Sequence, residues 1–191
     1  ARLPAFKYAE ITGITSKATG KTISGAFIGC PLTTEQMLQM PEDYVVGKII
    51  KAGKVAEKMG AGIVGLGAMT SVVADAGITG AGELDIPVTT GNSYTVAMAI
   101  EGTKDAAAKM GIDISEADVV VVGATGAIGA VCSQLISREG KYLTLIARDR
   151  RKLDNLASRI LHETGQAVKI TSDLKKALKS AQIVITVTSS G

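Results

Sequence analysis

The sequence predicts an α/β protein whose second half is built around a parallel β-sheet. Apolar runs of strand length recur there near residues 118–123, 142–147, 167–171 and 182–187. Segments with helical periodicity separate these runs, near residues 127–139, 150–164 and 173–180. Strands and helices that alternate in this way form a parallel sheet with helices on both faces, so we expect a doubly wound sheet in this half.

The first half of the chain predicts a smaller α/β domain. Short β-prone stretches around Gly13 and Gly25 indicate a pair of strands. The segment after Pro41 has helical spacing and ends at Gly60, where a glycine is typical of a helix end. The run "AGIVGLGAM" (residues 61–69) predicts a buried strand.

A long helix joins the two halves. The segment "DIPVTTGNSYT" predicts a short strand and then a helix that Asn92 or Ser93 caps and Gly111 ends. We expect the boundary at its start, with a substrate-side domain over residues 1–92 and the parallel-sheet domain over residues 93–191. We expect the second domain to be truncated at its C-terminal end.

The composition excludes several classes of protein. Aromatic residues make up 3% of the chain and Trp is absent, which leaves too few rings to stack on nucleic-acid bases. Two cysteines and one histidine provide no metal cluster and no disulfide framework, and the apolar runs are too short for an integral membrane segment. The expected compartment is the cytoplasm. Six methionines at largely apolar helix positions are expected in the core: Met37, Met40, Met59, Met69, Met98 and Met110.

Positive charge gathers in the last part of the chain. Residues 138–191 hold 11 Lys and Arg against 5 Asp and Glu, a balance of +6, whereas residues 1–137 hold 10 against 13, a balance of −3. A basic segment of this kind indicates an anionic ligand, although solvated helix faces account for part of it.

A glycine-rich loop follows the first strand of the predicted sheet. In "VVVVGATGAIGAV", Gly123, Gly126 and Gly129 follow a strand and open a helix, as the dinucleotide-binding fingerprint of a Rossmann-type fold requires. Free N–H groups and the helix dipole then face a pyrophosphate. A tight turn without a ligand is the simpler alternative. The predicted phosphate-binding residues are Gly123, Thr125, Gly126, Ala127, Ile128 and Gly129.

The residues after the second strand predict which dinucleotide binds. NAD sites usually place an acidic residue there, but this strand is followed by Arg148, Arg151 and Lys152. Asp149 lies one position past Arg148 and should point elsewhere. Cations at a helix start oppose the helix dipole, and a bound 2′-phosphate would remove that conflict. A solvated helix start is the alternative, and we predict NADP.

A polar cluster precedes the long helix. Thr90, Asn92 and Ser93 lie where the two domains should meet, which is a common place for a substrate cleft. Cys132 has the spacing of a packed core residue, and Cys30 has no nearby histidine to activate it. The residues alone identify no catalytic group and no metal ligand.

The motifs resemble those of a known family. "TTGNSYT", "MGIDISEADVVVVGATGAIGAVC" and "LIARDRRKLDNL" are similar to the cyanobacterial long-chain acyl-[acyl-carrier-protein] reductase family. The resemblance implies reduction of an acyl thioester to an aldehyde with NADPH and a substrate carried on an acyl-carrier protein. It also implies that the family's nucleophilic cysteine lies beyond this chain, because neither Cys30 nor Cys132 matches it.

A more distant resemblance is to shikimate dehydrogenase. By that resemblance Thr188, Ser189 and Ser190 of "VTVTSSG" would lie near the nicotinamide. The chain departs from it at Tyr94, where those enzymes carry an Asp, and "CPLTTEQML" lacks their catalytic Lys. The alternatives are therefore a small-molecule dehydrogenase of shikimate or amino-acid type and a non-catalytic NADP-binding regulatory module. A homo-oligomer is also left open.

Overall fold

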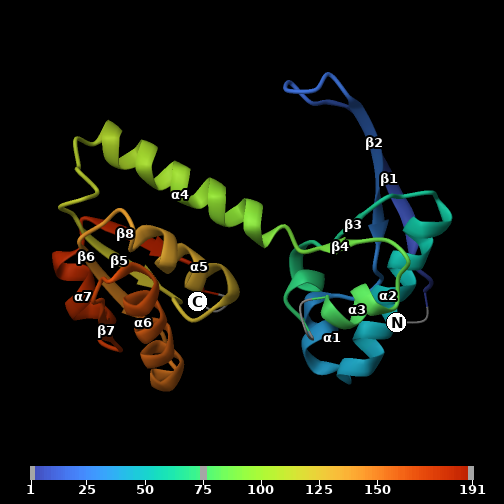
Figure 1. The fold of residues 1–191 in the computed structure, drawn as a ribbon. Coiled ribbons are helices and arrows are strands. Elements are labelled where there is room, and N and C mark those ends of the chain that lie inside the picture. Colours follow the sequence, from blue (N-terminus) through green and yellow to red (C-terminus); the bar gives the residue numbers. More distant parts are fainter. Residues whose placement is uncertain (1–2, 74–76, 189–191) are drawn as a thin grey trace. The chain divides into compact units, whose positions relative to one another are not determined.

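The chain divides into two compact units. The computed structural model describes residues 3–73 and 77–188. Unit 1 comprises Ala1–Gly91 and unit 2 comprises Asn92–Gly191 (Figure 1).

Unit 1 begins with a long hairpin and two helices. Strand β1 (Phe6–Thr15) pairs antiparallel with β2 (Thr22–Gly29), which confirms the predicted strand pair. Helices α1 (Thr34–Gln39) and α2 (Glu42–Lys58) follow, and α2 covers the predicted helix after Pro41. Val45 and Ile49 of α2 pack with Met37 and Val73 in a small core.

Helix α1 was not expected from the sequence. Its start is stabilised by a capping box. The backbone N–H of Gln36 donates to Thr33 Oγ1 (3.2 Å), and the backbone N–H of Thr33 donates to Gln36 Oε1 (3.1 Å). A Thr followed three residues later by Gln is the signal that marks this start. The helix has only six residues, too few for its periodicity to stand out.

The rest of unit 1 has short elements. Strand β3 (Val64–Gly65), the 3₁₀ turn η1 (Ala68–Ser71), helix α3 (Ile78–Gly82) and strand β4 (Val88–Thr89) follow in order, and β3 pairs parallel with β4. The predicted buried strand over residues 61–69 is therefore wrong in length and in burial, because Ile63 is 58% exposed. Its glycines contribute no side chains that packing could bury.

Unit 2 is the predicted doubly wound domain. After α4 (Asn92–Lys109), its elements are β5 (Asp118–Val122), α5 (Ala127–Ile136), β6 (Tyr142–Ile146), α6 (Arg150–Thr164), β7 (Lys169–Thr171), α7 (Leu174–Ser180) and β8 (Ile183–Thr186). The four strands are parallel in the order β7-β6-β5-β8. The chain adds β6 and then β7 on one side of β5 and afterwards places β8 on the other side, so the order of the strands reverses between β5 and β8. A reversal of this kind is the point at which Rossmann-type sheets bind nucleotides.

Both faces of this sheet are covered. Val119 and Val121 lie in one buried cluster with residues of α4, α5 and α6. Val120 and Ile146 lie in a second cluster with Ala177 of α7. The alternation of side chains along each strand thus feeds two cores, which explains why the strands read as continuous apolar runs.

Three methionines do not lie in a core. Met59, Met98 and Met110 are 45%, 51% and 73% exposed, which corrects the expectation that they are buried. Met110 follows the end of α4, and Met59 caps α2, so both lie at helix ends.

Candidate dinucleotide-binding site

The glycine loop is tied to the carboxyl end of β6. The backbone N–H groups of Gly123 and Ala124 both donate to the carbonyl of Ile146, at 2.8 and 3.0 Å, and Gly126 N–H donates to the Gly123 carbonyl at 3.1 Å. Helix α5 begins directly afterwards, at Ala127. The loop therefore has one defined conformation beside the neighbouring strand.

Two of the three glycines are demanded by the protein itself. Gly123 has φ +83°, and a Cβ atom there would lie 2.6 Å from the carbonyl oxygen of Val187. A Cβ atom at Gly129 would overlap the Gly123 carbonyl oxygen and lie 2.9 Å from Val187 Cγ2. Neither position accepts any other residue without moving backbone.

Gly126 is different, because the protein leaves space beside it. A Cβ atom there would meet the Gly123 carbonyl oxygen at 3.4 Å, close to ordinary contact, and the residue is exposed. Its backbone has an ordinary φ of −72°. The missing side chain therefore opens the outer surface of the loop, as the second glycine of a pyrophosphate-binding loop does.

The start of α5 presents uncapped N–H groups at this opening. Gly126 is the N-cap residue, and no side chain caps the helix. Ala127 is exposed, whereas Thr125 and Ile128 are half-buried. The first N–H groups of a helix have no partner within it and carry the positive end of its dipole, so this end can hold an anion.

The three predicted cations beside the loop are free. Arg148, Arg151 and Lys152 are exposed, and over residues 3–73 and 77–188 none of them forms an ion pair. Arg150 between them is engaged, because its Nε lies 3.4 Å from an oxygen of Asp154.

Asp149 does turn away, as the sequence predicts. It is the N-cap of α6, and its carboxylate accepts the backbone N–H of Lys152 at 3.1 Å. An acidic residue is thus present beside the strand end, and one of its carboxylate oxygens accepts a hydrogen bond from the first turn of α6.

The end of β8 completes the surroundings of the loop. Val187 N–H donates to the carbonyl of Val122 at 2.9 Å, and the Thr188 methyl group lies 3.2 Å from a Cβ position built on Gly123. Ser189 and Ser190, predicted to lie near the nicotinamide, are outside the described residues. Val187 was missed by sequence reasoning. Its position directly after a strand of the same sheet was the available signal.

The predicted cleft residues lie at the boundary of the units. Thr90 belongs to unit 1, whereas Asn92 and Ser93 are the first residues of α4 in unit 2. Both are inside the helix, so neither is the residue that precedes it, which corrects the expected cap. Their role beside a substrate stays a prediction.

Both thiols are protected from ionisation. Burial raises the pKa of Cys132, which is fully buried. Burial also raises the pKa of the half-buried Cys30, and the positive charge of Lys48 opposes that effect in part. Neither group has the lowered pKa of an activated nucleophile. In the described part of the chain no cluster of His, Cys, Asp and Glu could hold a metal ion.

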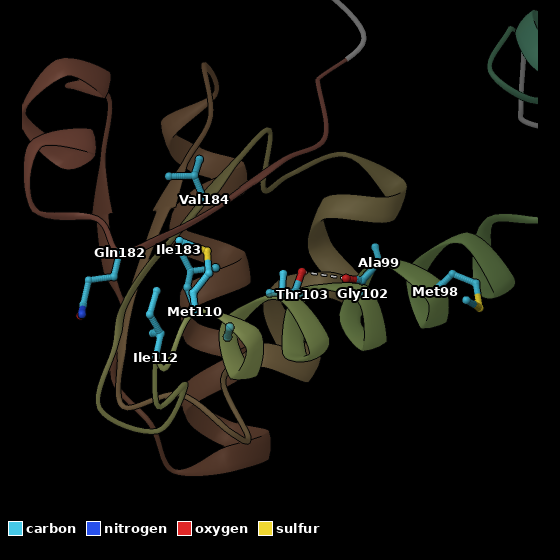
Figure 2. A pocket seen from close by; sticks show the side chains of 11 residues that line it. Met98, Ala99, Gly102, Thr103, Met110, Ile112, Gln182, Ile183 and Val184 are labelled. Carbon is cyan, nitrogen blue, oxygen red and sulfur yellow. Dashed lines mark hydrogen bonds between the residues drawn. The ribbon is translucent and has the colours of Figure 1, made fainter.

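An apolar groove of about 380 Å³ lies on another side of unit 2 (Figure 2). Met98 of α4 and Met110, which follows α4, line it together with Gln182 and Val184 around the start of β8. The Thr103 hydroxyl donates to the Ala99 carbonyl at 2.7 Å, so it is satisfied within α4. The groove lies at the amino end of β8, whereas the glycine loop follows the carboxyl end of β5, so the groove is separate from the candidate site.

None of the described helices has the length and apolar character to cross a membrane.

The sheet order and the glycine loop define unit 2 as a Rossmann-type dinucleotide-binding domain. Residues 104–191 match the family model for Shikimate / quinate 5-dehydrogenase.

Two curated proteins are similar over most of the chain. The chain is 36% identical over 189 residues to a long-chain acyl-[acyl-carrier-protein] reductase of Synechococcus elongatus, a match that covers 94% of this chain and 53% of that protein. It is 28% identical over 190 residues to the aminotransferase PigE of a Serratia species, covering 99% of this chain and 22% of that protein. The chain thus spans about half the length of the reductase and less of the aminotransferase.

Among solved structures, a short chain dehydrogenase from Shigella flexneri complexed with NADP shares 30% identity over 31% of this chain and 25% of its own. Its TM-score is 0.28, too low to carry an argument. The reductase and the dehydrogenase family model confirm the resemblance predicted from the sequence. They agree with the predicted class, an NADP-dependent oxidoreductase.

Proposed function

We propose that this chain is the cofactor-binding part of an NADP-dependent oxidoreductase that reduces an acyl thioester to an aldehyde. The observation that carries the proposal is an open, side-chain-free loop surface at Gly126 together with three cations that form no ion pair within the described residues, one between β6 and α6 and two in the first turn of α6. An anionic dinucleotide with an extra phosphate matches both features. The substrate class rests on the similarity to the acyl-[acyl-carrier-protein] reductase.

The residues of this chain bind and orient the cofactor. The N–H groups at the start of α5 and the Thr125 hydroxyl hold the pyrophosphate, and Arg148 grips the 2′-phosphate with Arg151 and Lys152 beside it. Thr188 would border the nicotinamide. NADPH, when bound, would supply the hydride to the thioester carbonyl carbon, and cleavage of the C–S bond would release the aldehyde and the protonated thiol of the carrier.

The substrate side is formed by Thr90, Asn92 and Ser93. These polar groups orient the thioester carbonyl for hydride transfer, and orientation supplies much of the rate in such reactions. Cys30 and Cys132 have raised pKa values and stay protonated near neutral pH, so neither acts as the nucleophile in this proposal.

A second candidate is a small-molecule dehydrogenase. The match to Shikimate / quinate 5-dehydrogenase favours it, but that match covers residues 104–191 and leaves out unit 1. Tyr94 and the absence of a Lys in "CPLTTEQML" speak against shikimate itself as the substrate.

Calorimetric titration of the chain with NADPH and separately with NADH tests the cofactor. We expect NADPH to bind at least tenfold more tightly. Equal affinities would contradict the assignment of a 2′-phosphate site. Absence of binding to either cofactor would mean that the glycine loop is only a tight turn.

Steady-state turnover of the full-length protein with NADPH separates the substrate classes. A long-chain acyl thioester should be reduced, whereas shikimate and amino acids should not react. Oxidation of a small alcohol or amino acid would favour the second candidate. Tight NADPH binding with no turnover of any of them would favour a regulatory module.

A further inference from the structure

The β1–β2 hairpin carries an apolar face that lies open to solvent. Ile14 and Ile23 are paired directly across the two strands, and Phe27 lies on the same face of β2 as Ile23, because strand side chains alternate. Phe6 is paired with Gly29, and its ring lies 3.0 Å from a Cβ position built there, so it shares this face. Four large side chains, which we call the hairpin apolar face, are 48–61% exposed: Phe6, Ile14, Ile23 and Phe27.

The opposite face of the hairpin is polar at its turn end, whereas Ala26 and Ile28 lie half-buried on it farther from the turn. Thr15 and Thr22 are paired, and their hydroxyl groups lie 2.9 Å apart. Lys7 and Glu10, which lie opposite Ile28 and Ala26 on this face, form an ion pair along β1. The hairpin is therefore an amphipathic ribbon, and its turn end extends beyond the helices of unit 1 (Figure 1).

The turn end of the ribbon is positively charged. No Asp or Glu occurs between Glu10 and Glu35, whereas Lys17 and Lys21 lie in the turn. Both lysines are exposed and form no ion pair within the described residues. Ser16 N–H donates to the Lys21 carbonyl at 2.9 Å, which fixes the turn just beyond Ile14 and Ile23.

We propose that this hairpin docks on an anionic lipid surface. The hairpin apolar face enters the boundary between headgroups and acyl chains, while Lys17 and Lys21 contact the phosphate groups of the lipids. Apolar side chains beside cations with long flexible stems are the chemistry of interfacial membrane binding. The proposal is independent of the reaction assigned to the glycine loop.

A lipid surface fits these observations better than a second copy of the chain. Four half-exposed side chains offer on the order of 400 Å² of surface, since a fully buried aromatic residue removes about 150–250 Å². A stable protein interface needs about 800 Å² from each partner. Two copies that met through this face would also bring two acid-free lysine turns together, whereas anionic lipid supplies the missing charge.

Co-sedimentation of the chain with lipid vesicles tests the proposal. One set of vesicles is pure phosphatidylcholine, and the other contains phosphatidylserine as well. We expect binding to the anionic vesicles at least fivefold above the neutral ones. We also expect at least a fivefold loss of bound protein for Ile14→Ser/Ile23→Ser and for Lys17→Gln/Lys21→Gln.

Matched variants in unit 2 serve as controls. Lys175→Gln/Lys176→Gln removes two exposed lysines, and Leu161→Ser removes a side chain that is 50% exposed; both should bind like the unchanged chain. Equal circular dichroism spectra establish that the variants are folded. Absence of binding, equal binding to both kinds of vesicle, or equal losses in the controls would overturn the proposal. So would a dimer in sedimentation velocity that Ile14→Ser/Ile23→Ser abolishes, because the partner would then be a second copy.

Discussion

Each unit of the chain has a glycine-rich strand exit, and the two exits differ in what the glycines do. Gly65 ends β3 and Gly67 follows it, yet a Cβ atom at either would meet nothing within 4 Å. Gly123 and Gly129 follow β5, and a Cβ atom at either would collide with backbone. The number of glycines in a loop is therefore a weaker signal than the atoms that surround them.

The difference comes from the sheets. β3 has two residues and pairs with β4, so few neighbouring atoms contact the residues that follow it. β5 lies between β6 and β8, and both neighbours reach its exit, one through the Ile146 carbonyl and the other through Val187. A central strand thus fixes the conformation of the loop that follows it, which a binding loop requires.

Alanine at the two exits gives the largest contrast. Gly129→Ala should lower the free energy of unfolding by about 3 kcal/mol and abolish cofactor binding, because helix α5 must move away from the Gly123 carbonyl. Gly65→Ala should change the stability by less than about 1 kcal/mol. Urea denaturation measures both variants. Similar losses would contradict the distinction between the exits.

The next largest effect concerns the cations beside the unit 2 loop. Arg148→Ala should cost about 2 kcal/mol of NADPH affinity, roughly thirtyfold in Kd, and leave NADH affinity unchanged. Arg150→Ala removes the same charge two residues later, but that side chain is paired with Asp154, so affinity for both cofactors should be maintained. If Arg148→Ala weakens NADH equally, Arg148 does not contact the 2′-phosphate.

The two thiols extend the comparison to the cores. Cys132 is buried in the unit 2 core and Cys30 is half-buried in unit 1, so a thiol reagent should label Cys30 in the folded chain and Cys132 only after unfolding. Mass spectrometry identifies the labelled peptide. Rapid labelling of Cys132 in the folded chain would show that the unit 2 core opens readily.

The pH dependence of the Cys132 contribution has a definite sign. Because burial raises its pKa in the folded state, the folded chain retains the thiol proton to higher pH than the unfolded chain does. The contribution is fully present below the unfolded pKa and is lost as the pH rises through the folded pKa. Cys132→Ala should therefore flatten the fall in stability on the alkaline side, as thermal unfolding at several pH values will show.

The smallest effect concerns the ion pair that joins α4 to the rest of unit 2. Lys104 of α4 lies 2.6 Å from a carboxylate oxygen of Glu139, and the hydrogen bond with Glu139 raises the pKa of Lys104. Lys104→Gln should shift the urea midpoint slightly at low salt and not at high salt, because both side chains are partly exposed. A large shift that salt does not screen would mean that packing, rather than charge, is lost.

Much of unit 2 was predictable from the sequence. Its strands are short apolar runs, and each lies within a few residues of the expected place, since both faces are buried and the pattern is strong. The position of Asp149 after Arg148 also indicated that its carboxylate would turn away, because a residue directly before a helix is placed to cap it.

What could not be predicted depends on contacts between distant parts of the chain. The close contact between Val187 and Gly123 joins residues that are 64 positions apart, and no local sequence pattern predicts it. Met98 and Met110 have apolar spacing, yet each is more than half exposed within the described residues. The same holds for the hairpin, where the β-prone stretches predict a strand pair but not whether another element covers one of its faces.

The close approach of Val187 to the glycine loop also makes the two segments move together. Anything that restrains Gly123 and Gly129 restrains the end of β8, since both glycines lie against Val187. The amide of Val187, which donates to the Val122 carbonyl, should therefore exchange its hydrogen more slowly when the loop is occupied. The exchange rate of this single backbone amide then reports whether a ligand occupies the loop, and the ligand itself needs no label.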